Sequence, residues 1–208
     1  MGFLSSSCSF TRFHVVDPIP SELWLQIPDK LKQFSFRDID NIPEERAWGW
    51  VSFEDMLDSE WRSAPPEKGS CLAFALRLDT RRIPPAVLKK HVTIALREEE
   101  ARNRESGKKF VSRERKKELQ AQVKMKLMHN FLPIPAIFDV IWAMDTNIVY
   151  LASTQRKLID LFLNHFTLTF GLHLEELTPY ELAVSMLGDH AQSALDTLEP
   201  TIFVSRQS

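Results

Sequence analysis

The chain has 208 residues, of which 44% are hydrophobic, and its formal net charge is −2. This length suits one medium-sized domain or two small ones, with enough apolar residues for a packed core. Low-complexity and membrane-spanning proteins are excluded, because glycine is scarce and no run of about eighteen uncharged apolar residues occurs. The cysteines, Cys8 and Cys71, lack CxxC or metal-ligand spacing, which indicates reduced thiols and a cytoplasmic protein.

The first part of the chain predicts strands with a helical segment between them. Residues 9–16 (SFTRFHVV) and 46–53 (RAWGWVSF) have the pattern of strands. The helical pattern between them contains Pro28, which predicts two short turns instead of one helix. Residues 71–82 (CLAFALRLDTRR) carry apolar side chains at every second position and predict a long strand.

Two helices are expected in the middle of the chain. Pro84 and Pro85 favour a helix start, because the first turn needs no backbone N–H donors. A loop around Gly107 should separate this helix from a second one, with Ser112 as its N-cap and Phe131 near its end.

The last third predicts two strands, a helix, a short strand and a helical tail. The strands cover residues 137–145 and 147–153, and Ser153 or Thr154 should cap the helix that follows. This order predicts an α+β fold with mixed or antiparallel sheets and paired long helices. The chain is expected to be a single unit over residues 1–208, or two packed lobes. The lobes would be residues 1–82 with 135–208, and a basic helical lobe at 83–134.

Charge is distributed unevenly along the chain. Residues 77–126 contain sixteen Lys or Arg and seven Asp or Glu, a local charge of +9. The rest of the chain therefore carries −11. Binding to nucleic acid depends on where the positive field lies, so a net charge of −2 does not argue against it.

The second basic helix has an apolar seam of Leu119, Val123 and Leu127 at helical spacing. Its cations flank the seam, and Glu114–Lys117 is the one obvious internal ion pair. Phosphate would be a natural partner for such a helix, and an ordinary solvated face is the alternative. The residues predicted to contact DNA are Lys89, Lys90, Arg97, Arg102, Lys108, Lys109, Arg113, Lys116, Lys117 and Lys124.

Catalytic motifs are missing from the sequence. It contains no GxSxG, HExxH, P-loop or GxGxxG pattern, and its histidines are scattered. A metal nuclease needs clustered carboxylates. The candidates are Asp38 with Asp40, and a PD…ExK string made by Asp29 and Glu114, which lie far apart in the sequence. We therefore predict no catalytic residue, metal or cofactor, with a nuclease as an alternative.

Several motifs occur in an order that resembles the bacterial recombination-associated protein family RdgC. No single motif is diagnostic, but their order and spacing agree over most of residues 9–185. The motifs are GWV at 49–51, IPPAVLKKHV at 83–92, RERKKELQAQVKMKL at 113–127, FLP at 131–133, WAMD at 142–145 and PYEL at 179–182.

The resemblance implies a non-catalytic, nucleoid-associated protein that binds double-stranded DNA without sequence preference. It also implies a homodimeric ring around DNA and an effect on recombinase filaments. Family members continue well past the PYEL turn, whereas this chain ends soon after it. The segment that helps to close the ring in the family is therefore not in this sequence, and the resemblance does not predict a closed ring for this chain. The alternative is a protein-interaction module that no longer encircles DNA.

Overall fold

The computed structural model describes residues 2–105 and 110–199, which form one antiparallel sheet of seven strands together with six α-helices. This confirms the predicted α+β class. The strands are β1 (Thr11–Val15), β2 (Arg46–Ser52), β3 (Glu67–Lys68), β4 (Cys71–Thr80), β5 (Ile134–Ala143), β6 (Ile148–Leu151) and β7 (Leu174–Glu176). The helices are α1 (Ser21–Gln33), α2 (Pro85–Glu105), α3 (Arg113–Met128), α4 (Arg156–Phe170), α5 (Pro179–Leu187) and α6 (Gln192–Asp196), with a short 3-10 turn at Asp189–Ala191.

The sheet has the strand order β2-β4-β5-β6-β1-β7, and β3 also pairs with β4. Its long central ladder joins β4 to β5, from Cys71 opposite Ala143 to Thr80 opposite Ile134. The chain leaves this ladder after Thr80 and returns to it at Ile134, so α2 and α3 are inserted into the connection of a hairpin. β2 and β7 lie at the two ends of the strand order.

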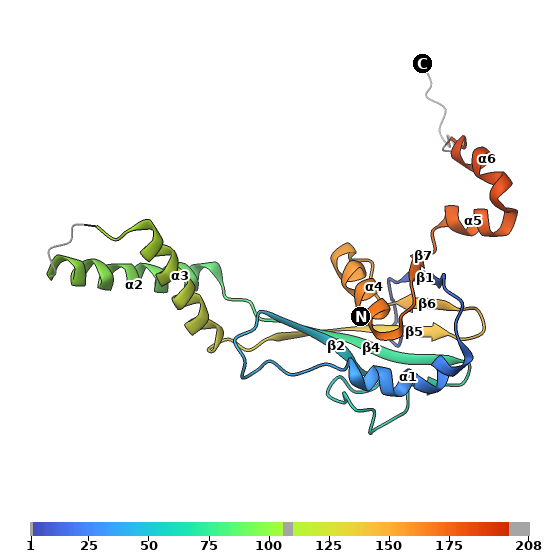
Figure 1. The fold of residues 1–208 in the computed structure, drawn as a ribbon, viewed down its shortest axis with the longest axis horizontal. Coiled ribbons are helices and arrows are strands. Elements are labelled where there is room, and N and C mark those ends of the chain that lie inside the picture. The colour runs from blue at the N-terminus through green and yellow to red at the C-terminus, as the bar shows by residue number, and fades with distance from the viewer. Residues whose placement is uncertain (1, 106–109, 200–208) are drawn as a thin grey trace, which may run out of the picture.

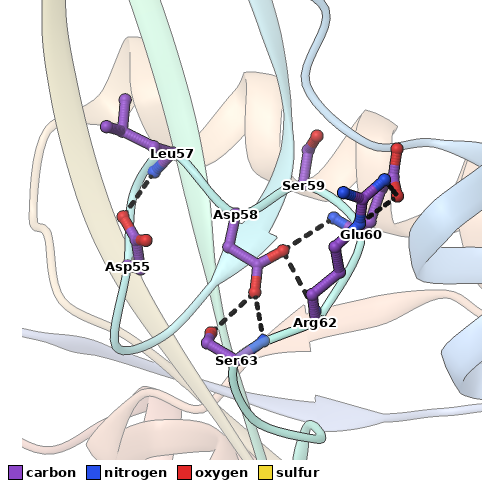
Figure 2. Close-up of a pocket in the computed structure, with 7 residues that line it drawn as sticks. All are labelled: Asp55, Leu57, Asp58, Ser59, Glu60, Arg62 and Ser63. Carbon is purple, nitrogen blue, oxygen red and sulfur yellow. Dashed lines mark hydrogen bonds and ion pairs between the residues drawn. The ribbon is translucent and has the colours of Figure 1, made fainter.

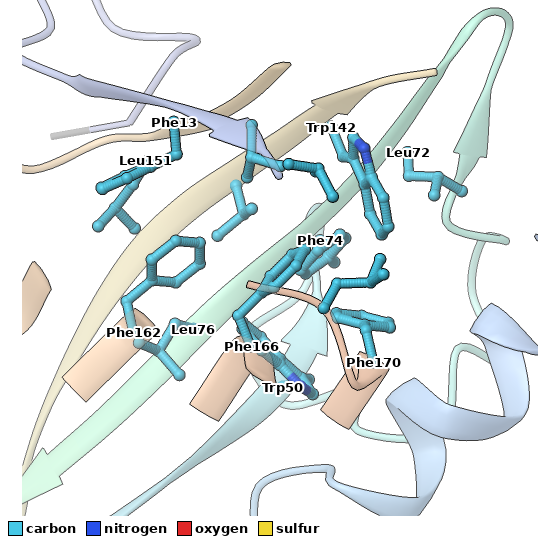
Figure 3. Packing of buried hydrophobic residues seen from close by; sticks show 14 of the residues in the cluster. Phe13, Trp50, Leu72, Phe74, Leu76, Trp142, Leu151, Phe162, Phe166 and Phe170 are labelled. Carbon is cyan, nitrogen blue, oxygen red and sulfur yellow. The ribbon is translucent and has the colours of Figure 1, made fainter. Parts of the chain in front are cut away.

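The core lies between one face of the sheet and the helices α1 and α4 (Figure 3). Trp50, Phe74 and Trp142 come from three adjacent strands and are fully buried. Their ring centroids lie 5.5 to 6.3 Å from that of Phe170 in α4. The Trp50 indole nitrogen donates to Thr169 Oγ1 at 2.8 Å, so the buried polar group is satisfied.

Helix α1 is continuous, so the prediction of two short turns at this position was wrong. Pro28 lies inside the helix and has no N–H, which deprives the Trp24 carbonyl of its usual partner four residues later. The helix persists because Leu23, Ile27 and Leu31 are all buried against the core. Burial of each such side chain contributes about 1.5–3 kcal/mol, which offsets the cost of the proline.

Two helix boundaries also differ from the sequence predictions. Helix α3 ends at Met128, short of the expected Phe131. The N-cap of α4 is Gln155, although Ser153 Oγ accepts a hydrogen bond from the Gln155 N–H at 3.2 Å. Ser112 is confirmed as the N-cap of α3, because its hydroxyl accepts from the N–H three residues later at 3.1 Å.

Residues 35–45 cross over the other face of the sheet, next to β2. Their close approach depends on Gly49, where a Cβ atom would lie only 2.4 Å from the backbone nitrogen of Phe36. Phe36 is buried there and clusters with Val51 and Ala75. The sequence motif GWV therefore has a structural reason for its glycine, which is the close passage of another backbone segment.

The remaining helices extend away from the sheet (Figure 1). Helices α2 and α3 pack against each other and form an arm that projects from one end of the sheet. Helices α5 and α6 follow β7 and leave the body at the other end. Whether the arm and the rest of the chain fold as two separate lobes stays a prediction.

None of the helices in the described part of the chain has the length and apolar character needed to cross a bilayer.

Candidate nucleic-acid interface

The arm presents rows of cations that follow helical spacing. Lys90, Arg97 and Arg104 recur every seven residues and therefore lie on one side of α2. Lys117 and Lys124 are likewise seven residues apart in α3. Arg113 lies one turn before Lys117, and all six cationic residues are exposed.

Each helix contributes a cation to a cleft at the far end of the arm. Arg104 of α2 and Lys116 of α3 line this cleft together with Glu100 and Phe110, and its volume is about 240 Å³. Arg102 lies two residues before Arg104 and therefore points to nearly the opposite side of α2. Lys126, nine residues after Lys117, points to the opposite side of α3 by the same reasoning. We call the side with Arg104 and Lys117 the cationic face of the arm.

The opposite side of the arm carries paired charges. Arg115 Nε donates to Glu99 Oε1 at 2.8 Å, and its Nη1 donates to Glu118 at 3.1 Å. Arg102 lies 3.8 Å from the Glu99 carboxylate. The hydrogen bond that Arg115 donates to Glu99 raises the pKa of Arg115. The internal ion pair of α3 among the described residues is Arg115–Glu118, so the predicted Glu114–Lys117 pair was wrong, and Glu99 of α2 adds a cross-helix partner.

The predicted contact residues divide into three groups. Arg102 and Lys124 have acidic partners, Glu99 for the first and Glu45 for the second. Lys108 and Lys109 lie outside the described residues. The others are exposed, and no carboxylate of residues 2–105 or 110–199 lies within ion-pair distance of them. They are Lys89, Lys90, Arg97, Arg113, Lys116 and Lys117.

Arg104 was missed by the sequence analysis. It is exposed and continues the seven-residue spacing of Lys90 and Arg97, so that spacing was a signal that could have identified it. The contact between Lys124 and Glu45 was also missed. Hydrogen bonding from Lys124 lowers the pKa of Glu45 and links the root of the arm to the segment before β2.

Two arginines of the basic stretch, Arg77 and Arg81, are buried beside the sheet and do not contribute charge to the arm. Arg77 forms a bidentate pair with Asp79, with both N–O distances at 2.8 Å, and its guanidinium lies 4.1 Å from the centroid of the Phe36 ring. The hydrogen bonds that Arg77 donates to Asp79 raise the pKa of Arg77. Arg81 is also buried. The +9 charge of the sequence stretch therefore overstates the positive charge at the surface.

A hollow is lined by residues of the loop 55–63, and most of the polar side chains that line it are hydrogen-bonded within the same loop (Figure 2). Asp58 accepts hydrogen bonds from the N–H groups of Glu60, Arg62 and Ser63 and from the Ser63 hydroxyl. Desolvation raises the pKa of Asp58, but these hydrogen bonds outweigh it and hold the pKa well below its usual value. The carboxylate thus stabilises the loop.

The carboxylates considered for a nuclease do not form a metal-binding cluster. Asp29 lies in α1 and Glu114 in α3, so the proposed string is on two separate helices instead of on paired strands. The Asp38 side chain accepts a hydrogen bond from the Asp40 N–H at 2.6 Å and so serves a local turn. In the described part of the chain, no group of three His, Cys, Asp or Glu side chains could hold a metal ion.

Comparisons with known proteins leave the family unassigned. No model of a known protein family matches the chain, and a search of curated proteins finds no significant match. The resemblance to RdgC therefore rests on the order of the sequence motifs and enters below as a proposal.

Proposed function

We propose that the chain binds double-stranded DNA without sequence preference, through the cationic face of the α2–α3 arm. The observation that carries this proposal is the pair of exposed cation rows, with Arg97 and Arg104 on one helix and Arg113 and Lys117 on the other. The arm projects from one end of the sheet, so its far end lies away from the body (Figure 1).

The chemistry of this face suits phosphate. When lysine and arginine side chains neutralise phosphates, counterions condensed on the DNA are released. The phosphates are alike along a duplex, so these contacts carry no sequence information. Contact with about five phosphates would make log K fall with log salt at a slope of about −4.5. Affinity should therefore vary strongly with salt and little with sequence.

The resemblance to RdgC supports a role in recombination. On this proposal the protein is non-catalytic, is associated with the nucleoid, acts as a homodimer and restrains recombinase filaments on DNA. The alternative is a protein-interaction module in which the arm is a solvated face.

The test compares two charge-reversal pairs on opposite sides of the arm. Arg104→Glu with Lys117→Glu reverses two charges on the cationic face. The control, Arg102→Glu with Lys126→Glu, reverses the same number of charges on the other side. Fluorescence anisotropy with two unrelated duplexes at several salt concentrations measures both affinity and slope.

The first pair should weaken binding to both duplexes equally and reduce the magnitude of the salt slope by about 1.8. The control pair should change the slope much less. An equal loss in both variants would show that the cationic face is not the interface. No loss in either variant would show that the arm is a solvated face.

A further inference from the structure

The outer edge of β2 is only partly paired. Trp50 N–H donates to the Phe34 carbonyl at 3.1 Å, and the Trp50 carbonyl accepts from Phe36 N–H at 2.9 Å. Ser52 N–H donates to Asp58 at 2.8 Å. In an antiparallel ladder, alternate residues point their backbone groups away from the partner strand, so Trp48 must also point its N–H and C=O outward. No backbone or side-chain group among the described residues pairs with this outward side of Trp48.

The unpaired edge at Trp48 opens into a groove of about 600 Å³. Phe34, Ile42 and the Trp48 indole provide apolar walls, and Trp48 is 43% exposed. The groove is hollow because the chain pairs with β2 at residues 34–36 and then crosses to the other face of the sheet.

His165 of α4 also lines the groove. Its side chain is 7% exposed, and its Nε2 atom has no hydrogen-bond partner in the described structure. This nitrogen is itself buried, so it is not open to a ligand in the groove. The groove thus combines an unpaired strand edge with an apolar wall.

We propose that this groove docks an extended peptide from a partner protein, which adds as a short strand to the edge of β2 at Trp48. The main chain of the peptide would pair with the Trp48 N–H and C=O, as in other strand-addition complexes. An apolar side chain of the peptide would lie against the exposed Trp48 indole.

The charges of the groove favour a peptide over a nucleic acid. Arg37 and Arg46 line it together with Asp38 and Glu44, so its formal charge is balanced. A phosphate backbone would gain little from such a balanced field, whereas an extended polypeptide supplies the alternating donors and acceptors that a strand edge requires. The inference is independent of DNA binding by the arm.

The test begins with linear dodecapeptides displayed on phage and selected against the intact chain. Enriched peptides are synthesised, and their binding is followed through the backbone amide and indole signals of Trp48 by NMR. Hydrogen exchange of the Trp48 amide should slow when peptide binds. N-methylation of the peptide backbone at the pairing position should weaken binding about tenfold, the loss expected for one hydrogen bond of about 1.4 kcal/mol.

Two variants separate the strand edge from the indole. Trp48→Val removes the indole but keeps the N–H, whereas Trp48→Pro removes both. Proline is tolerated here because this N–H does not bond to β4. Peptides should bind the proline variant about tenfold more weakly than the valine variant, while thermal unfolding shows that both are folded.

Three outcomes would overturn the proposal: no enriched peptide, equal binding to both folded variants, or binding that leaves the Trp48 amide unprotected. Protection of Trp48 that rises with protein concentration alone would assign the edge to a second copy of the chain, which also contradicts a separate partner.

Discussion

At the scale of single residues, Arg81 shows how a cation in a basic stretch can serve the fold. It is 5% exposed, and its guanidinium donates to the carbonyls of Ile39, Asp40, Ile42 and Glu44. These carbonyls belong to the segment that crosses the sheet beside β2, so one side chain fixes a whole loop. Charge counting along the sequence could not distinguish Arg81 from its exposed neighbours.

Replacing Arg81 with methionine should lower the free energy of unfolding by about 3 kcal/mol. Methionine keeps the length of the side chain but leaves several carbonyls without donors. Urea denaturation measures the change. The control is Arg82→Met at the adjacent exposed residue, which should cost less than about 0.5 kcal/mol. Equal effects of the two substitutions would contradict the structural role of Arg81.

His165 should make stability depend on pH. Desolvation lowers the pKa of His165 from 6.5 to about 4. The unfolded chain therefore binds a proton near pH 6.5, whereas the folded chain does not until about pH 4. Between these values the free energy of unfolding should fall as pH falls, by at most about 3 kcal/mol in total.

His165→Gln removes this titration, so the stability of the variant should decline less between pH 6.5 and 4 than that of the native chain. Urea denaturation at several pH values gives both curves, and the carboxylates contribute equally to each. Parallel curves would show that His165 is not protonated on unfolding in this range.

At the scale of elements, α1 shows tertiary packing overriding a local signal. Pro28 has an interior position, and its substitution by alanine would restore an N–H opposite the Trp24 carbonyl. We expect Pro28→Ala to raise the free energy of unfolding by about 1–2 kcal/mol. This is less than the roughly 3 kcal/mol propensity difference, because proline also restricts the unfolded chain.

Gln26→Ala on the exposed side of the same helix is the matched control. It introduces alanine but leaves the number of backbone N–H donors in the helix unchanged. Thermal and urea unfolding should separate the two variants. A loss of stability in Pro28→Ala would show that the helix depends on the proline ring.

Local signals predicted much of the element order but little of the pairing between elements. Strand-like sequence located β2, a period-two pattern located β4, and Ser112 correctly marked the start of α3. The continuity of α1 depends on burial, and the Arg115–Glu99 pair joins two helices. Neither can be read from one segment, because both depend on how distant segments meet. For the same reason, the sequence identified cations of the arm but could not show which of them form ion pairs with carboxylates and which remain without a partner.

At the scale of the molecule, the arm is a large connection between adjacent central strands. Thr80 and Ile134 face each other at its root, so a short turn could join β4 to β5 in its place. Replacing residues 83–131 with Asn-Gly should keep the sheet folded, with a change of about 1 kcal/mol or less, because shortening a loop changes its closure entropy only slowly. DNA binding should be lost.

Circular dichroism, thermal unfolding and anisotropy test this truncation together. An unfolded product would show that the arm belongs to the same folding unit as the sheet and would contradict the two-lobe prediction. A folded product that still binds duplex would place the DNA interface elsewhere.

The chain is also expected to form a dimer. Leu187 and Leu198 of the C-terminal segment are 55% and 71% exposed, whereas Leu195 is half-buried. Apolar groups gathered on a projecting segment favour association. Light scattering should give twice the 24.1 kDa mass of one chain at micromolar concentration. A single-chain mass across that range would refute the prediction.

The projecting arm and tail have a consequence for how this molecule moves through solution. A compact chain of this mass would expose about 10,000 Å², whereas this one exposes 14374 Å². Such an elongated particle meets more friction than a sphere of equal mass, so it sediments slowly and elutes early from a sizing column. A single chain would therefore register as heavier than 24.1 kDa on a sizing column calibrated with globular standards, and as lighter than 24.1 kDa when its sedimentation rate is compared with theirs.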